Sequence, residues 1–174
     1  KEVENSGAEL LAVHGRTAKQ KYTGQANWDA IKEIYENTNI FLVGNGDIKN
    51  PEQIDDYLHS HADALMIGRG AIGNPKLFKD FIQYRDNKQQ YLKEQEKLQE
   101  MSREEKDEIK KKEQKTYFLR YLKHLKNIKL QREVYRIQHQ AMYFFKGISG
   151  ARDLRQKLQH VKTIDEVMRV VEDF

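Results

Sequence analysis

Two glycine-rich segments constrain the fold of this chain more than any other feature, because each directly follows a short apolar run. Residues 40–43 (IFLV) precede residues 44–47 (GNGD), and residues 64–67 (ALMI) precede residues 68–70 (GRG). Short, partly β-branched apolar runs bounded by glycine are typical of buried parallel strands. Residues 51–58 between them have a helical pattern. The sequence therefore predicts a strand–helix–strand unit with a ligand site at the carboxyl ends of its strands.

The helix of this unit has a recognisable start. Asn50 is a residue type favoured at a helix N-cap, and Pro51 follows at the first helical position. A third apolar run, residues 10–13 (LLAV), ends at His14, and another helical pattern begins near Trp28. The predicted order is therefore β-α-β-α-β, an α/β fold.

Three predicted strands are too few for a closed barrel. A (β/α)8 TIM barrel needs eight strands and roughly 200 residues or more. This chain has 174 residues, with strands predicted only in its first half. We therefore expect either the last three strands of a partial barrel or a small doubly wound sheet.

Composition excludes several classes of protein. The chain has no Cys, which rules out disulfides and thiolate metal sites, and His59 and His61 around Ser60 are more typical of a polar loop than of a metal site. No apolar run approaches the length that spans a membrane, so we expect neither a membrane nor a metal partner. A cytoplasmic location fits, with an organelle left open, and the sequence does not indicate an oligomeric state.

The second half of the chain is predicted to be helical. Residues 85–115 carry ten Lys or Arg and nine Asp or Glu with few apolar residues, which is typical of a solvated helical linker or a disordered insert. Residues 116–146 fit one long amphipathic helix or two, and residues 151–158 are helical again. Thr163 and Glu166 form a capping-box pattern before a last helix. The expected architecture is α/β followed by an all-α helical bundle domain.

Positive charge is concentrated in this helical part. Residues 116–160 contain ten Lys or Arg and two acidic residues. Steps of three or four residues predict one charged stripe on one helix, made of Arg120, Lys123, Lys126, Lys129, Arg132 and Arg136. Tyr135, His139 and Tyr143 are interleaved with it. Such a stripe is either a solvated face or a binding surface for a polyanion, with nucleic acid as the obvious candidate.

Four residues beside the glycine segments are candidates for chemistry. His14, at a strand end, could hydrogen-bond a ligand or be satisfied within its turn. Asp47 could cap the next helix, order the loop or bond a ribose or ribityl hydroxyl, and Asn45 could serve the turn. Arg69 is the strongest candidate, because its glycine neighbours allow close approach of the backbone and a guanidinium binds phosphate bidentately.

Three segments, in this order and spacing, resemble the tRNA-dihydrouridine synthase family, flavin enzymes that reduce particular uridines in tRNA. The segments are residues 13–28 (VHGRTAKQKYTGQANW), 43–48 (VGNGDI) and 66–78 (MIGRGAIGNPKLF). The resemblance is close over residues 7–82. It continues weakly through residues 143–158 (YFFKGISGARDLRQKL), which are similar to the helical domain with which the family grips tRNA.

The resemblance implies a cofactor, a partner and a set of roles. In the family, flavin mononucleotide (FMN) in the barrel passes a hydride from NADPH or NADH to an extruded uridine. By resemblance, His14 lies near the flavin, and Arg16 contacts the flavin or the target base. The residues implied to hold the FMN phosphate are Asn45, Gly46, Asp47, Gly68 and Arg69. The residues that would contact tRNA are Arg120, Lys123, Arg132, Arg136 and Arg152.

The chain departs from the family pattern in ways that bear on activity. The family's catalytic acid is a cysteine in the front half of the barrel, where a flavin-binding lysine also belongs. This chain has no cysteine, so we assign no catalytic residue within it. We expect both residues upstream of Lys1, and the chain to be a carboxyl-terminal fragment that is inactive alone. Ala18, Asn27 and Lys76 differ from residue types common in the family, at loop and surface positions.

The expected domains are the carboxyl-terminal part of a flavin-binding barrel (residues 1–84), a charged linker or insert (85–115) and a helical tRNA-binding domain (116–174). Two alternatives stay open. One is a different FMN-binding barrel oxidoreductase that acts on a small molecule and needs no basic helix. The other is a non-catalytic RNA-binding scaffold, which would bind no flavin.

Overall fold

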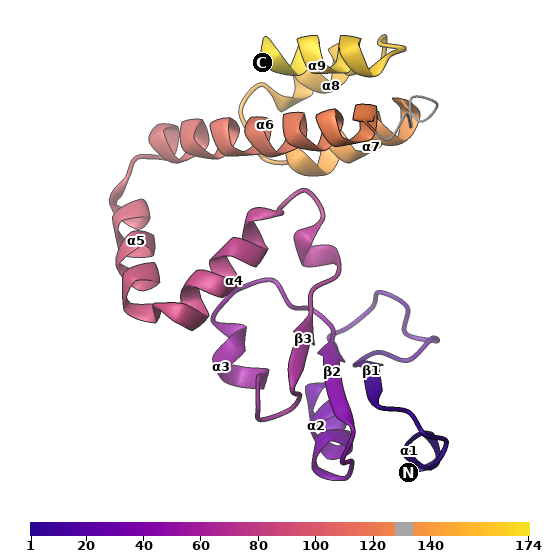
Figure 1. Cartoon of the computed structure of the whole chain (residues 1–174). Coiled ribbons are helices and arrows are strands. Elements are labelled where there is room, and N and C mark those ends of the chain that lie inside the picture. Colours follow the sequence, from indigo (N-terminus) through magenta and orange to yellow (C-terminus); the bar gives the residue numbers. More distant parts are fainter. Residues whose placement is uncertain (128–133) are drawn as a thin grey trace. The chain divides into compact units, whose positions relative to one another are not determined.

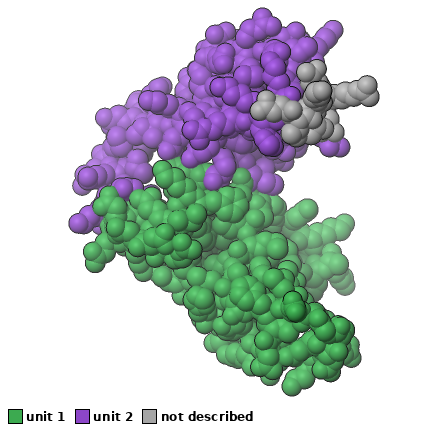
Figure 2. All heavy atoms as spheres, viewed as in Figure 1, with its two compact units in different colours: residues 1–71, 76–92 green, residues 72–75, 93–174 purple. Residues whose placement is uncertain are grey.

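The computed structural model describes residues 1–127 and 134–174. The chain forms two compact units, residues 1–71 with 76–92 (unit 1) and residues 72–75 with 93–174 (unit 2), shown in Figure 2. Each unit has its own hydrophobic core. The two units are therefore described separately.

Unit 1 is built on a three-stranded parallel sheet, whose strands in spatial order are β1 (Leu10–His14), β2 (Phe41–Asn45) and β3 (Ala64–Met66) (Figure 1). The connecting helices are α2 (Trp28–Glu36) and α3 (Gln53–Tyr57), and a short α1 (Glu2–Asn5) precedes the sheet. The predicted β-α-β-α-β order is confirmed. Because the strands are parallel, their carboxyl ends lie at one edge of the sheet.

Helix α2 has a defined start because Asn27 caps it. The Asn27 side chain accepts a hydrogen bond from the backbone N–H three residues later, at 3.1 Å. The helix turns Trp28 and Ile31 onto Leu42, and all three are buried. The Trp28 ring also stacks on the Tyr57 ring, with centroids 3.9 Å apart, which joins α2 to the end of α3.

Helix α3 starts later than the sequence predicted. The pattern predicted a helix over residues 51–58 capped by Asn50, but the helix begins at Gln53 after a turn. The Gln53 side-chain oxygen accepts hydrogen bonds from the N–H groups of Lys49 (2.7 Å) and Asn50 (3.0 Å). A side chain inside the helix thus satisfies the backbone donors that precede it, and Asn50 does not act as the cap.

The two faces of the sheet are covered differently. One face, with Leu11 and Leu42, packs in the core with α2. The opposite face carries three large apolar side chains that remain exposed, Leu10 at 55%, Phe41 at 48% and Met66 at 46%. Parallel sheets normally have both faces covered. In the part of the chain that the structure describes, this face of the sheet is therefore exposed.

Three elements follow the sheet: η1 (Arg69–Ala71), α4 (Lys76–Asp86) and α5 (Lys88–Glu100). Leu77 and Phe81 of α4 join the core of unit 1. The Tyr84 hydroxyl donates to the Asp55 carboxylate at 2.5 Å, and the Lys88 ammonium lies 2.5 Å from the same oxygen. These contacts tie α4 and the start of α5 to α3.

Unit 2 contains a helical bundle of α6 (Arg103–Asn127), α7 (Val134–Phe144), α8 (Ala151–Leu158) and α9 (Ile164–Glu172), coloured from salmon to yellow in Figure 1. Phe118 and Leu122 of α6 are fully buried among side chains of the other three helices, such as Ile137 and Val167. Thr163 caps α9 as predicted, accepting a hydrogen bond from the Glu166 N–H at 3.2 Å. The prediction of a helical second part agrees with this bundle.

The charged segment of residues 85–115 is helical over most of its length, because it contains α5 and the first half of α6. Within unit 2, the Asp107 carboxylate accepts a hydrogen bond from the Ser149 N–H at 3.0 Å. The Lys110 ammonium donates to the Lys146 carbonyl at 3.2 Å. The first half of α6 is thus attached to the segment between α7 and α8. The functional domain boundaries stay a prediction, since compactness does not test function.

Candidate functional site

A cavity of about 180 Å³ opens at the carboxyl edge of the sheet in unit 1. All six residues predicted to hold a cofactor line it, namely His14, Asn45, Gly46, Asp47, Gly68 and Arg69. The sequence did not single out Tyr22, Ile48 and Lys49, which line it as well. The parallel strands bring these distant segments to one place, while the role of each side chain stays a prediction.

Hydrogen bonds between the strand ends hold the cavity together. The Gly15 N–H donates to the Asn45 carbonyl at 2.9 Å. The Asn45 side-chain amide in turn donates to the Met66 carbonyl at 2.6 Å. Asn45 therefore joins the ends of all three strands.

Two glycines are needed where the loops approach one another. Gly46 has a φ of +141°, and a Cβ there would lie 2.5 Å from the Ala26 Cβ. A Cβ at Gly70 would overlap the Ile48 carbonyl oxygen. The loop after β2 thus contacts both the loop after β1 and η1, because these positions lack side chains.

Asp47 is the most connected side chain at the cavity. Its Oδ2 accepts hydrogen bonds from Arg16 Nη2 at 2.6 Å and from the Ala26 N–H at 2.9 Å, and its Oδ1 lies 3.5 Å from Arg69 Nη2. The Arg16 hydrogen bond is the main cause that lowers the pKa of Asp47. Partial burial acts in the opposite direction, and the Ala26 N–H and the Lys49 charge lower it further. The carboxylate is therefore ionised at neutral pH.

Arg16 is buried beside the cavity and does not line it, with its side chain only 4% exposed. Besides Asp47, it donates to the carbonyls of Gly24 (2.6 Å) and Thr23 (3.3 Å). Its Nη1 is buried without a hydrogen-bond partner among the described residues. Arg16 thus holds the loop of residues 17–26 against Asp47, and its contact with flavin or base stays a prediction.

Arg69 is half exposed, and its guanidinium lies 4.6 Å from the centroid of the Tyr22 ring. This distance is within the range of a cation–π contact. The Tyr22 ring is itself 76% exposed. Since the contact with Asp47 is long, Arg69 retains N–H donors for an anionic ligand. Sequence reasoning missed Tyr22, because a loop tyrosine carries no local signal for a distant arginine.

His14 is exposed at the end of β1. Its Nδ1 accepts a hydrogen bond from the Arg16 backbone N–H at 3.0 Å. In the neutral ring this bond puts the proton on Nε2. The arrangement therefore presents Nε2–H as a donor for a ligand.

The residues predicted to contact tRNA lie on three helices. Arg120 and Lys123 are on α6, Arg136 is on α7 and Arg152 is on α8, and all four side chains are exposed. Arg132 lies outside the described residues.

The prediction of one charged stripe on one helix is wrong. The Phe118 ring of α6 packs on the Phe144 ring of α7, with centroids 5.0 Å apart. A continuous helix would place these two residues about 39 Å apart. Helices α6 and α7 therefore lie side by side, and Arg136 does not continue a line from Arg120 and Lys123.

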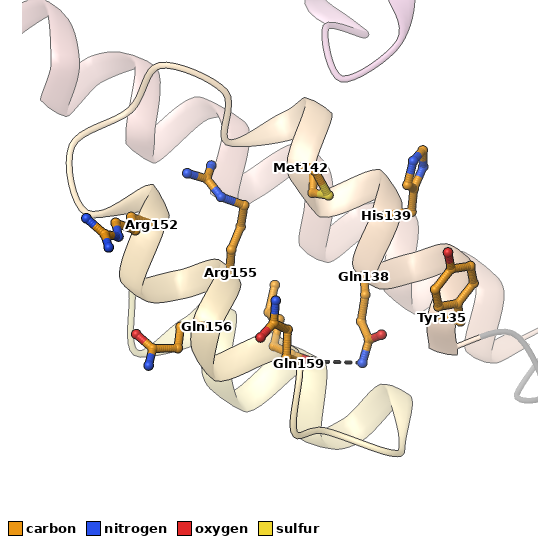
Figure 3. Close-up of a pocket in the computed structure, with 9 residues that line it drawn as sticks. Tyr135, Gln138, His139, Met142, Arg152, Arg155, Gln156 and Gln159 are labelled. Atoms are coloured by element: carbon orange, nitrogen blue, oxygen red, sulfur yellow. Dashed lines mark hydrogen bonds between the residues drawn. The ribbon is translucent and has the colours of Figure 1, made fainter.

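A larger groove, of about 620 Å³, lies between α7 and α8 in unit 2 (Figure 3). It is lined by Tyr135, Gln138, His139 and Met142 of α7 and by Arg152, Arg155, Gln156, Leu158 and the following Gln159. The Gln138 amide donates to the carbonyls of Leu158 (2.8 Å) and Val161 (3.1 Å), which joins α7 to the end of α8. None of the described lining residues is acidic. Of this set, only Arg152 was predicted as a site residue.

Metal sites and membrane-spanning helices are two further features that bear on function. In the part of the chain that the structure describes, no group of three or more His, Asp or Glu side chains could hold a metal ion. Over residues 1–127 and 134–174, no helix combines the length and the apolar character that crossing a membrane requires.

Parallel strands connected by helices, with glycine loops that meet at the carboxyl edge of the sheet, define the class of this part of the chain as α/β. Sequence comparison gives the family within this class. The profile described as dihydrouridine synthase matches residues 1–174. The chain therefore belongs to the dihydrouridine synthase family.

Curated relatives carry the same description. A probable tRNA-dihydrouridine synthase of Aquifex aeolicus is 27% identical over 174 residues, which are 99% of this chain and 49% of that protein. A tRNA-dihydrouridine synthase B of Shewanella oneidensis is 50% identical over 50 residues, 29% of this chain and 16% of that protein. A probable tRNA-dihydrouridine synthase of Rhizobium leguminosarum bv. phaseoli is 43% identical over 63 residues, 36% and 20%. The chain spans about half the length of the first of these relatives, and its matches to the other two cover less.

Proposed function

We propose that this chain is part of a flavin-dependent tRNA-dihydrouridine synthase. The reaction is the reduction of uridine to dihydrouridine in tRNA, with NADPH or NADH as the reductant. One observation carries the proposal: in a chain of the dihydrouridine synthase family, all six residues implied to hold FMN line one cavity at the carboxyl edge of the sheet. We place the activity in the cytoplasm, with an organelle left open.

The proposed architecture is the last three strands of a (β/α)8 barrel followed by a tRNA-binding bundle, with domains at residues 1–84, 85–115 and 116–174. The open sheet face supports it. Leu10, Phe41 and Met66 lie on the face opposite α2, which a closed barrel turns inward and fills with side chains. The chain has no cysteine that could serve as the family's catalytic acid, so we expect the chain alone to be inactive.

The cavity suits the phosphate end of FMN. Its volume of about 180 Å³ is small for a whole flavin, so it would hold only part of the cofactor. Two arginines and Lys49 outweigh the single charge of Asp47, which leaves a net positive site for an anion. A Cβ at Gly68 would meet only Asn45, at 3.9 Å, so its backbone is open to close approach. When bound, FMN supplies the hydride-transfer chemistry.

The chain's own residues then have separate tasks. Arg69 anchors the phosphate through charge-assisted hydrogen bonds. Asp47, itself held by Arg16, positions Arg69. His14 offers its Nε2–H to the ring or the ribityl chain of the flavin.

The helical bundle is the proposed tRNA-binding part. Arg120, Lys123, Arg136 and Arg152 are exposed, and Arg132 belongs to the same proposed set. Lysine and arginine side chains on such surfaces bind phosphates and release counterions, so binding should weaken with salt.

The test is the visible absorption spectrum of the protein made from the whole reading frame, together with the dihydrouridine content of tRNA incubated with it and NADPH. We expect a bound-flavin spectrum that Arg69→Gln weakens and that Lys79→Gln, an exposed change on α4, leaves intact. A colourless folded protein that still binds tRNA would instead identify an RNA-binding scaffold. A flavin protein that ignores tRNA would point to a small-molecule oxidoreductase.

A further inference from the structure

Helix α7 carries an exposed row of aromatic side chains, of which Tyr135 and His139 line the groove between α7 and α8. Tyr135, His139 and Tyr143 are spaced by four residues, so they share one face of α7. Tyr135 is 79% exposed and Tyr143 is 43% exposed, and the His139 ring meets the Tyr143 ring edge-on at 5.3 Å. The core face of α7 carries Ile137 and other buried residues instead. The row is therefore not part of the hydrophobic core.

The other wall of the groove carries unpaired positive charge. Arg152 and Arg155 of α8 line the groove, and among the described residues neither guanidinium has an ion pair or a hydrogen bond. Elsewhere in the bundle a lysine forms an ion pair, since the Lys126 ammonium lies 2.6 Å from the Asp165 carboxylate. Figure 3 shows Arg155 extending from α8 into the space beside α7, from which Tyr135 and His139 project.

We infer that this groove binds an unpaired nucleotide of RNA, with its base stacked on Tyr135 or His139 and its phosphate on Arg152 or Arg155. Aromatic faces stack on bases of any sequence, and guanidinium groups bind phosphates. A base-paired nucleotide is excluded, because its faces are already covered by its neighbours in the helix. The inference rests on the proposed function only in taking tRNA, whose loops contain unpaired nucleotides, as the source of the ligand.

The groove favours this ligand over an apolar one. Its volume of about 620 Å³ falls within the range of small-ligand sites. The lining consists mainly of arginine, glutamine, histidine and tyrosine, with Met142 and Leu158 as the apolar members. Glutamine amides such as that of Gln156 can both donate to and accept from a base edge.

The first arm of the test concerns the base. The full chain is titrated into a labelled single-stranded RNA of about 10 nucleotides and, separately, into a blunt duplex of the same sequence, with fluorescence anisotropy as the readout. We expect Tyr135→Ala to weaken single-strand binding about 5- to 150-fold and to leave duplex binding unchanged. Tyr135→Phe, which keeps the ring, should bind the single strand as the wild type does. Because Tyr135 is largely exposed, neither change should affect folding, which circular dichroism checks.

The second arm concerns the phosphate, with a matched pair on one helix. Arg155→Gln and Lys157→Gln each remove one positive charge from α8, but only Arg155 lines the groove. We expect Arg155→Gln to lower the slope of log K against log salt for the single strand by about 0.7. Lys157→Gln should change it less.

The outcomes separate this inference from the proposed function. If the chain binds tRNA but Tyr135→Ala weakens neither RNA, or weakens both equally, the nucleotide site is wrong while the proposed tRNA partner stands. If the chain binds the single strand through Tyr135 but binds no tRNA at low salt, the nucleotide site stands and the proposed partner is wrong. Selective loss of single-strand binding, restored in Tyr135→Phe, supports the site.

Discussion

The carboxylate of Asp47 accepts a 2.6 Å hydrogen bond from the buried guanidinium of Arg16. The other oxygen of the same carboxylate faces Arg69, at 3.5 Å. One acid therefore connects an arginine that is almost fully buried to one that is half exposed at the cavity. The position of Arg69 depends on Arg16 through this carboxylate.

Replacing Asp47 with Asn should loosen this arrangement. The amide keeps the size of the side chain but loses the charge that Arg16 and Arg69 face. A hydrogen bond between charged groups contributes about 1.5–3 kcal/mol, so we expect a drop of that order in the free energy of unfolding at pH 7, measured by urea titration. If Asp47→Asn is as stable as the wild type, the contact with Arg16 is not a structural one.

The same variant reports the pKa of Asp47. Since the folded pKa of this carboxyl is lowered below 3.8, its contribution to stability is complete above the unfolded value and is lost as pH falls through the folded value. The stability difference between wild type and Asp47→Asn should therefore be constant from about pH 7 to 5 and shrink below about pH 4. A difference independent of pH would contradict this.

Gly70→Ala should destabilise the loops at the cavity. The added methyl would overlap the Ile48 carbonyl oxygen, which is backbone and cannot turn aside. Overpacking of this kind costs about 1–3 kcal/mol, which a thermal melt would show. Gly68→Ala is the control, because the nearest atom to its Cβ would be Asn45 Nδ2 at 3.9 Å. Equal melting temperatures for the two variants would be the contrary result.

Gln138→Ala should weaken the helical bundle. Its amide serves the carbonyls of Leu158 and Val161, and partly buried acceptors without a donor cost about 1–3 kcal/mol. Gln156→Ala removes the same amide from an exposed position on α8 and should stay within about 0.5 kcal/mol of the wild type. Denaturant unfolding of both variants measures the difference.

Arg120→Ala should reduce the salt dependence of tRNA binding more than Lys126→Ala. Both residues are exposed on α6, but the Lys126 ammonium lies 2.6 Å from the Asp165 carboxylate, which partly neutralises its charge. A lost phosphate contact lowers the slope of log K against log salt by about 0.7–0.9. Filter binding at several salt concentrations gives the slopes, and identical slopes for wild type and Arg120→Ala would show that Arg120 only faces solvent.

The strands and the first part of the fold were predictable because their signals are local. The apolar runs before Gly44 and Gly68 and the cap at Thr163 are each complete within a few residues. The start of α3 was not predictable in this way, since the Gln53 side chain accepts hydrogen bonds from the N–H groups of Lys49 and Asn50, and Asn50 was expected to be the cap.

The side-by-side arrangement of α6 and α7 was not predictable from charge spacing. Lysine and arginine are good helix formers, so a run of basic residues does not indicate where one helix ends. The contact of Phe118 with Phe144 settles the geometry, and it is a tertiary contact. The cavity also depends on tertiary contacts in part. Its six expected residues lie in short segments that can be recognised from the sequence, whereas the contact of Tyr22 with Arg69 forms only in the folded loop.

The open face of the sheet has a consequence for handling the protein. Leu10, Phe41 and Met66 form an apolar surface on the sheet. The outer edges of β1 and β3 have no partner strand among the described residues. Apolar surface next to free strand edges favours pairing with another molecule. Solutions of this chain by itself should therefore form aggregates that grow with protein concentration, and a protein with all eight strands of the proposed barrel should stay dispersed.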